Sequence, residues 1–231
     1  MSCDANPYSI RSIRSNESTP NIVSIQYEDG TKYEGEFVNN EKSGFGISTY
    51  PNGDIYEGYF KNDLFHGRGK FTSSEMIYDG FWERGYCHGE GKEQWKDGSQ
   101  FHGFFLNGIK EGKGKYRFFD GSLYEGNWVQ GRMEGLGMFK QIDGDVYEGK
   151  FKNGKKHGRG RLTSASGNIY EGDFVGGERE GFGILLLFNG ERYEGYFKAN
   201  KMHGEGSYFD INGEEFRGNW YFGKRLNTTE N

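Results

Sequence analysis

Proline and cysteine are scarce in this chain, and long apolar stretches are missing. Three prolines beside 40 glycines exclude a collagen-like triple helix, which needs many more prolines. Two cysteines, Cys3 and Cys87, cannot build a disulfide framework and fit a reducing compartment. The longest apolar run, residues 184–188, is far shorter than the roughly 20 residues that span a bilayer. Residues 1–8 carry no apolar run of a secretory signal. We therefore expect a cytoplasmic protein.

The chain is polar yet rich in aromatic residues. Hydrophobic residues make up 33% and the mean hydropathy is -0.91, values that would suit a disordered chain. Aromatic residues nevertheless reach 17%, which a disordered chain of this polarity would lack. The net charge of -5 argues against nucleic acid as a partner. Together these features predict an ordered, glycine-rich β protein.

A repeat of about 23 residues organises the sequence. Each of nine copies contains aromatic-x-Gly-x-aromatic, and in the first eight copies a Gly-x-Gly follows seven residues later. The first aromatic residues are Tyr33, Tyr56, Tyr78, Phe101, Tyr124, Tyr147, Tyr170, Tyr193 and Phe216. The second ones are Phe37, Phe60, Trp82, Phe105, Trp128, Phe151, Phe174, Phe197 and Trp220. An internal period of this kind indicates a repeat architecture.

The alternation within each copy predicts β-hairpins. Residues two apart in a strand share a face, so both rings and the glycine between them should lie together. We expect the Gly-x-Gly strand to follow the same alternation, and its glycines to leave a shelf for a neighbouring ring. Asp-Gly and Asn-Gly pairs such as 29–30 and 52–53 suggest tight hairpin turns.

These patterns predict an all-β fold, an elongated single-sheet solenoid of tandem antiparallel β-hairpins. The array should cover residues 22–226, with residues 22–28 as an incomplete opening strand. Residues 1–21 should form a disordered N-terminal tail and residues 227–231 a short C-terminal tail.

Two segments carry a resemblance to a known family. Tyr-Glu-Gly-Tyr-Phe-Lys-Asn at 56–62 precedes His-Gly-Arg-Gly at 66–69, and a similar arrangement spans residues 147–160. Both resemble the membrane occupation and recognition nexus (MORN) repeat, over almost the whole chain. This resemblance implies an adaptor, as at cytoskeletal structures, in axonemal radial-spoke heads or in junctophilins that bridge membranes. Some family members also carry catalytic domains, for which residues 1–21 and 227–231 are too short.

The candidate residues in the sequence do not indicate a catalytic, cofactor or metal site. Four histidines, at 66, 88, 157 and 203, occupy one repeat position just before Gly-x-Gly. Equivalent positions in adjacent hairpins should lie about 10 Å apart, too far for one zinc ion. A hydrogen-bonding role is the simpler interpretation. The repeated glutamates suit a solvated face, and Cys87 sits at a variable loop position without a partner. We expect no enzyme and no cofactor.

The sequence therefore predicts a non-catalytic scaffold that binds a cytoskeletal, axonemal or signalling protein along an aromatic groove. The groove residues, which should hold a peptide or helix, are Phe71, Trp82, Tyr116, Trp128, Phe139 and Tyr208. The alternative is a peripheral membrane protein that binds anionic phospholipids through a basic patch. The patch consists of Lys150, Lys152, Lys155, Lys156, Arg159 and Arg161. A homodimer could form through the C-terminal edge around Phe216 and Trp220.

Overall fold

The computed structural model describes residues 21–226, and in this part of the chain every regular element is a β-strand. The tails were predicted at 1–21 and 227–231; residues 1–20 and 227–231 lie outside the described residues, and Asn21 begins the first strand. The strands are β1 (Asn21–Gln26), β2 (Lys32–Val38), β3 (Glu41–Thr49), β4 (Ile55–Lys61), β5 (Leu64–Thr72), β6 (Met76–Glu83), β7 (Tyr86–Trp95), β8 (Gln100–Leu106), β9 (Ile109–Arg117), β10 (Leu123–Val129), β11 (Arg132–Lys140), β12 (Val146–Lys152), β13 (Lys155–Thr163), β14 (Ile169–Val175), β15 (Glu178–Leu186), β16 (Arg192–Lys198), β17 (Lys201–Phe209), β18 (Glu215–Tyr221) and β19 (Lys224–Arg225).

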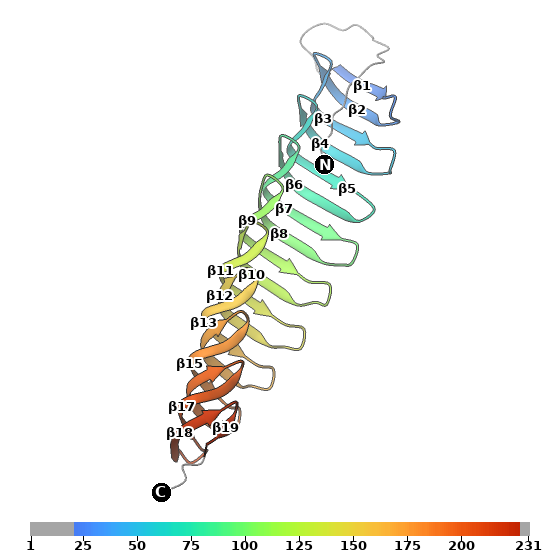
Figure 1. Cartoon of the computed structure of the whole chain (residues 1–231). Coiled ribbons are helices and arrows are strands. Elements are labelled where there is room, and N and C mark those ends of the chain that lie inside the picture. Colours follow the sequence, from blue (N-terminus) through green and yellow to red (C-terminus); the bar gives the residue numbers. More distant parts are fainter. Residues whose placement is uncertain (1–20, 227–231) are drawn as a thin grey trace. The chain divides into compact units, whose positions relative to one another are not determined.

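The chain divides into two compact units, with the boundary between Lys110 and Glu111 inside β9. Within unit 1, strands β1 to β8 pair in chain order, and within unit 2 the same holds from β10 to β19 (Figure 1). All of these pairings are antiparallel. The predicted all-β fold of tandem antiparallel hairpins in an open sheet is confirmed. No helix among residues 21–226 could span a membrane.

The tight turns do not lie at the Asp-Gly and Asn-Gly pairs, where they were predicted. The tight two-residue turns follow the second aromatic of each copy, as at Asn62 and Asp63, which both have positive φ (51° and 63°). The Asn-Gly and Asp-Gly pairs lie instead in three-residue loops. At Asn52-Gly53 only the glycine has a positive φ (88°), and Asn52 Oδ1 accepts a hydrogen bond from Asp54 N at 3.1 Å. This is a turn closed by a left-handed glycine, which accommodates one residue more than the tight turn.

The first glycine of each Gly-x-Gly forms a β-bulge. Its φ lies between 60° and 79° in all eight copies, a region that favours glycine. In β12 and β13 the register shifts here, because Gly149 pairs with Gly160 but Phe151 pairs with Lys156. The expected alternation nevertheless holds against the next strand, where Gly158, Gly160 and Leu162 pair with Phe174, Gly172 and Tyr170. Two residues are inserted on the Gly-x-Gly strand, so Lys156 and Leu162 on either side of the bulge still lie on the face of the rings.

The aromatic residues of the repeat form the core of each unit. One face of each sheet, here called the inner face, carries the first and second aromatics of every copy, and most are fully buried. Tyr33, Tyr56, Tyr78 and Tyr124 have no exposed surface. The opposite side, here called the outer face, carries the intervening residues, such as Glu57 and Tyr59. The units are too thin for a conventional core, so stacked rings supply the apolar burial.

Candidate protein-binding surface

The first aromatic ring of a repeat lies over a pair of glycines on the inner face. A Cβ atom added to Gly160 would lie 2.5 Å from Cε2 of Tyr147. The Tyr147 hydroxyl donates a hydrogen bond to the carbonyl oxygen of Lys150 at 2.8 Å. The same bond is made by Tyr33, Tyr56, Tyr78, Tyr124, Tyr170 and Tyr193. The predicted glycine shelf is thus present, and it fixes each ring in place.

The second aromatic ring packs edge to face between two of these first rings. The Tyr78 centroid lies 4.9 Å from that of Trp82 in its own repeat and 5.2 Å from that of Phe105 in the next. Trp82, Trp128 and Trp220 are only 8%, 6% and 8% exposed. These predicted residues therefore belong to the buried row of rings, where their first contribution is to packing.

A second row of half-buried side chains lies beside the buried rings. Phe71 pairs across the strands with Tyr56 and with Tyr78, which places it on the inner face. The Tyr116 centroid lies 6.0 Å from that of Trp128. The predicted groove residues in this row, all half-buried, are Phe71, Tyr116, Phe139 and Tyr208. Their exposed surface is the part of the predicted groove that a partner can reach.

A third row of inner-face residues did not stand out in the sequence. Each lies five positions after the second aromatic and faces it across the tight hairpin, as Lys156 faces Phe151 and Arg179 faces Phe174. The row comprises Lys42, Phe65, Cys87, Lys110, Met133, Lys156, Arg179 and Met202. The constant spacing of five positions from the second aromatic could have revealed this row in the sequence, but its residue types vary from copy to copy.

Four members of this third row are cations that lie over aromatic rings. Lys110 Nζ is 4.7 Å from the centroid of Trp95, and Lys156 Nζ is 5.4 Å from that of Tyr147. Lys42 and Arg179 make similar contacts. Burial lowers the pKa of Lys156 and of Arg179. The ring quadrupole attracts a cation, typically by about 0.5–2 kcal/mol. The inner face therefore combines apolar surface with positive groups at intervals.

One buried ion pair interrupts the inner face of unit 1. Lys110 Nζ lies 2.6 Å from Glu93 Oε2, and the two side chains are 18% and 11% exposed. Glu93 occupies the same repeat position as Phe71 and is the only acid in that row of the described chain. The carboxylate thus neutralises the charge of a lysine that is buried among aromatic rings.

Cys87 lies on this same face rather than in a loop. It belongs to β7 and pairs with Trp82. Burial, followed by the charge of Glu93, raises the pKa of the thiol to about 12. The prediction of a loop position is corrected, because the tight turn ends before this residue. A thiol with so high a pKa is a poor nucleophile.

The repeat position of the four histidines lies beside the tight turns. In copies with glutamate there, the carboxylate accepts a hydrogen bond from the next tight turn, as Glu134 does from Asn153 N at 2.8 Å. In a histidine copy, His88 Nε2 instead lies 3.3 Å from Glu83 Oε2. No cluster of three or more metal-ligating side chains occurs among residues 21–226. The position therefore connects successive hairpins in the glutamate copies, whereas His88 contacts a residue of its own hairpin.

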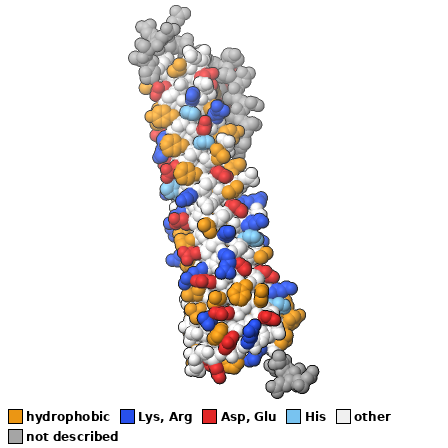
Figure 2. Space-filling view, turned by 90° about the vertical axis from the view of Figure 1, so that its left-hand side faces the viewer, with side chains coloured by type: hydrophobic (Ala, Val, Ile, Leu, Met, Phe, Trp, Pro, Cys, Tyr) orange, Lys and Arg blue, Asp and Glu red, His pale blue; other side chains and the backbone are white. Residues whose placement is uncertain are grey.

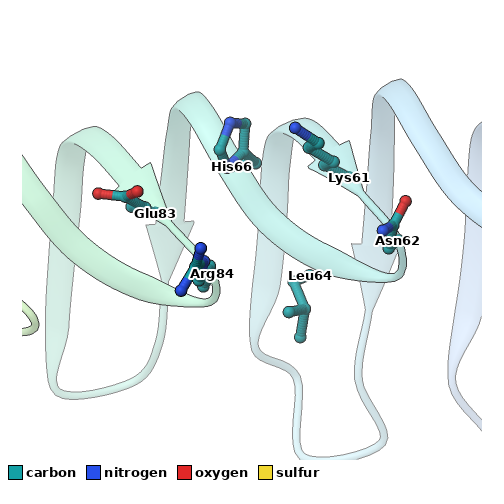
Figure 3. A pocket seen from close by; sticks show the side chains of 6 residues that line it. All are labelled: Lys61, Asn62, Leu64, His66, Glu83 and Arg84. Carbon is teal, nitrogen blue, oxygen red and sulfur yellow. The ribbon is translucent and has the colours of Figure 1, made fainter.

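A shallow pocket of about 340 Å³ lies beside two of these turns in unit 1 (Figure 3). It is lined by Lys61, Asn62, Leu64, His66, Glu83 and Arg84. Figure 3 shows that the last two come from the hairpin that follows the other four. The lining carries both charge signs and one leucine, so it presents no uniform field to a ligand.

The predicted basic patch is divided between the two faces of unit 2. Lys156 faces the rings, whereas Lys150, Lys152, Lys155, Arg159 and Arg161 are exposed. Arg161 Nη1 lies 2.8 Å from Glu171 Oε1, and Arg159 pairs across the strands with Asp173. Figure 2 shows similar mixing over one face of the protein, where blue basic and red acidic side chains are interspersed.

The predicted dimer edge lies at β18. This strand pairs with β17 from Glu215 to Trp220, but β19 covers only Trp220 and Tyr221. The Arg225 guanidinium lies 5.5 Å from the ring centroid of Phe216. Among the described residues, most of the edge of β18 that faces away from β17 is therefore not paired with another strand. Pairing of two chains at this edge remains a prediction.

The fold and its aromatic inner face define a repeat protein built from β-hairpins that stack in series. The chain belongs to the MORN repeat family, which matches it over eight consecutive stretches. These are residues 33–55, 56–75, 78–100, 101–123, 124–146, 147–169, 170–192 and 193–215. The ninth copy, from Phe216, lies beyond the matched residues.

Two solved structures are among those to which this chain is similar. One is the TCP10 domain of Danio rerio CPAP in complex with a STIL peptide, 11% identical, covering 87% of this chain and 100% of that chain, with a TM-score of 0.44. The other is the Drosophila melanogaster SAS-4 TCP domain with a proline-rich motif of Ana2, 12% identical, covering 92% of this chain and 99% of that chain, with a TM-score of 0.39. TM-scores below 0.5 define neither a shared site nor a shared partner.

Proposed function

We propose that this MORN repeat protein is a non-catalytic scaffold that binds a segment of another protein along its inner face. The observation that carries the proposal is the row of half-buried rings, such as Phe139 and Tyr208, fixed beside buried rings in the same sheet. Their positions are already set by packing, so binding would cost little ordering of side chains. Rigid aromatic groups of this kind dominate binding energy at protein interfaces.

The charges of the inner face indicate the chemistry of the bound segment. In unit 2 Lys156 and Arg179, which face Phe151 and Phe174, lie in the two hairpins between those of the accessible rings Phe139 and Tyr208. A segment that carries aromatic or aliphatic side chains together with acidic ones would complement this surface. We extend the proposal to a partner of the cytoskeleton, the axoneme or a signalling complex, because MORN adaptors elsewhere serve such assemblies.

The test compares proximity labelling by the wild-type chain and by a groove variant, Phe139→Ser with Tyr208→Ser. Serine is a residue that this repeat position accepts, since Ser48 occupies it in the second hairpin. The matched control is Leu136→Ser with Tyr196→Ser, two outer-face side chains that are 63% and 53% exposed. Circular dichroism must show the same melting behaviour for all three chains.

Under the proposal, a set of proteins labelled by the wild type and by the control disappears with the groove variant. The purified partner should then bind the groove variant at least about tenfold more weakly, a loss of roughly 1.4 kcal/mol. Identical labelling by the groove variant would refute a binding role for these rings.

A membrane-binding function is the second candidate, favoured by four exposed basic residues on β12 and β13 that make no ion pair within 4.0 Å. These are Lys150, Lys152, Lys155 and Arg159. Each basic residue near an anionic surface contributes about 1 kcal/mol. The acidic residues Glu148, Glu171 and Asp173 lie among them and oppose the attraction.

Co-sedimentation with phosphatidylserine vesicles at two salt concentrations tests this second candidate. If the patch binds lipid, the chain sediments with anionic but not with neutral vesicles, and salt weakens the effect. Replacing Lys150, Lys152 and Lys155 by glutamate should then abolish sedimentation, whereas the variant Lys198→Glu with Lys201→Glu should retain it. Unchanged sedimentation of the triple variant would exclude the patch.

A further inference from the structure

A row of exposed apolar side chains follows the loop tips of unit 2. Each residue is the first of a three-residue loop, and four of the five are large and apolar. The row, here called the loop ridge, consists of Phe119, Ile142, Ala165, Phe188 and Ile211. Phe119 and Phe188 are 76% exposed, and Ile142 and Ile211 are 68% exposed. In unit 1 the same position holds polar residues or proline, such as Glu28, Pro51 and Lys96.

The loop ridge is held in place by bonds between successive loops. The backbone amides of Ile142 and Phe188 donate to Ser122 Oγ at 3.2 Å and to Asn168 Oδ1 at 2.9 Å. Three of the ridge side chains, those of Ile142, Ala165 and Phe188, also lie close to the glycine of the preceding loop. Cδ1 of Ile142, for example, would be 3.0 Å from a Cβ on Gly121. The ridge is therefore an ordered surface.

Folding gives no reason for this row, because its side chains remain in water. The ridge lies at the loop ends, whereas the apolar burial of unit 2 comes from the inner-face rings. Apolar side chains grouped on an ordered surface mark sites of interaction. The repetition at one loop position in five consecutive hairpins makes the ridge continuous within the unit.

The charges around the ridge decide which partner it fits. The five loops, residues 118–122, 141–145, 164–168, 187–191 and 210–214, contain six acidic residues and neither lysine nor arginine. The six are Asp120, Asp143, Asp145, Glu191, Asp210 and Glu214. Hydrogen bonds to Asp210, first from the Glu214 amide, lower the pKa of its carboxyl, so this group is charged at neutral pH. Such a fringe repels an anionic membrane and attracts a basic partner.

The spacing of the ridge points to a helix. Successive ridge residues lie one hairpin apart, which corresponds to two strand spacings or about 9.6 Å. Seven residues of an α-helix advance about 10.5 Å. The two spacings differ by about 0.9 Å, so a seven-residue repeat stays within about 4 Å of the ridge positions over four intervals. The four intervals from Phe119 to Ile211 then correspond to about 28 helical residues.

We propose that the loop ridge binds a basic amphipathic α-helix of a partner protein, with apolar residues that recur every seven positions. The ridge side chains are different residues from the half-buried rings, and the two rows adjoin where Glu191 hydrogen-bonds Tyr208 and where the Phe118 ring lies 5.6 Å from that of Phe139. The chain would then join two partners, one held in each place. The ridge proposal does not depend on the function proposed for the inner face.

A designed peptide provides the test. A fluorescein-labelled peptide of about 29 residues, long enough for five positions seven apart, carries leucine at the first and fourth position of each heptad and lysine at most other positions. Fluorescence anisotropy measures its binding to the full chain. One control peptide carries glutamate in place of lysine, and a second has the lysine peptide's composition in scrambled order. The lysine peptide should bind at least tenfold more tightly than either control, and salt should weaken its binding.

Variants of the protein locate the binding. The ridge variant combines Phe119→Ser, Ile142→Ser, Phe188→Ser and Ile211→Ser. We expect it to lose at least tenfold in affinity, and a charge variant with Asp143→Asn and Glu191→Gln to lose severalfold. The matched control replaces exposed outer-face residues, Leu136→Ser with Val175→Ser, and should bind as the wild type does. The groove variant should also bind normally, which separates the two proposals.

Several results would overturn the ridge proposal. These are equal affinity of the wild type and the ridge variant, equal affinity for the lysine and glutamate peptides, and the absence of binding by the lysine peptide. Sedimentation with anionic vesicles that is lost in the ridge variant would assign the ridge to a membrane instead.

Discussion

Tyr147 and Gly160 lie on adjacent strands, β12 and β13, with no space between the tyrosine ring and the glycine for a Cβ atom. Gly149, which pairs with Gly160, is equally restricted, since its Cβ would meet the Tyr147 hydroxyl oxygen at 2.5 Å. These glycines are therefore required by the ring and not by their own backbone angles. The arrangement allows a single sheet to bury a tyrosine ring almost completely.

Replacing Gly160 by alanine should destabilise the chain by about 1–3 kcal/mol, since overpacking forces the ring to move. The matched control is Gly218→Ala, at the glycine between the two aromatics of the last copy, which is the position of Gly149; there the nearest heavy atom would be Arg225 Nε at 3.7 Å. Urea unfolding followed by circular dichroism measures both. A loss for Gly218→Ala as large as that for Gly160→Ala would show that ring contact is not the cause.

The sequence was sufficient to locate the strands and the buried rings. The 23-residue period repeats residue types that only one face of a strand can accommodate, so each strand falls where the aromatic-x-Gly-x-aromatic motif stands. Ile22, for example, was expected in an opening strand, and β1 spans Asn21–Gln26. The glycine shelf could also be predicted, because a glycine that always stands between two aromatic residues of a strand leaves room for a neighbouring ring.

Three features did not follow from the sequence, each for a physical reason. The bulge at Gly158 depends on a positive φ that glycine permits but does not require. Non-glycine residues with positive φ, such as Asn62 and Asp63, form the tight turns, and single residues carry little signal for this. The third inner row, which includes Lys110 and Arg179, varies in residue type because cations and apolar side chains both pack on rings.

The thiol of Cys87 should react slowly in the folded chain. Burial raises its pKa to about 12, so little thiolate exists near neutral pH. In a Cys3→Ser chain, which leaves one thiol, the rate of reaction with Ellman's reagent at pH 8 should be at least about tenfold below that of free cysteine. Unfolding in urea should restore the ordinary rate. Rapid reaction of the folded chain would contradict the buried position.

Alkaline pH should destabilise unit 2 through its buried tyrosines. Burial raises the pKa of Tyr124, Tyr147, Tyr170 and Tyr193 to about 12, above the ordinary value of 10.0. The folded state therefore disfavours the phenolate. The corresponding stability is fully present below pH 10 and is lost as the pH rises from about 10 to about 12. Tyrosine absorbance at 295 nm should rise together with unfolding. Ionisation of these tyrosines near pH 10 without unfolding would contradict the prediction.

Removing one partner of the Glu93–Lys110 ion pair should destabilise the chain more than replacing both partners by apolar residues. Lys110→Met leaves the Glu93 carboxylate buried without its partner, which should cost about 3–5 kcal/mol. Leu185 and Met202 occupy the equivalent positions in unit 2, so the array already tolerates an apolar pair there. The double variant Glu93→Leu with Lys110→Met should therefore recover most of the loss, because apolar replacement of a buried pair is often neutral.

A double-mutant cycle in urea, completed by Glu93→Leu, measures the coupling between the two residues. Glu93→Leu alone should also destabilise, since Lys110 would keep its rings but lose its counter-ion. If the effects of the two single variants simply added in the double variant, the charges would be acting independently, and the 2.6 Å contact would carry no energy of its own. A double variant close to the wild type would show instead that the pair replaces an apolar contact at one point of the inner face.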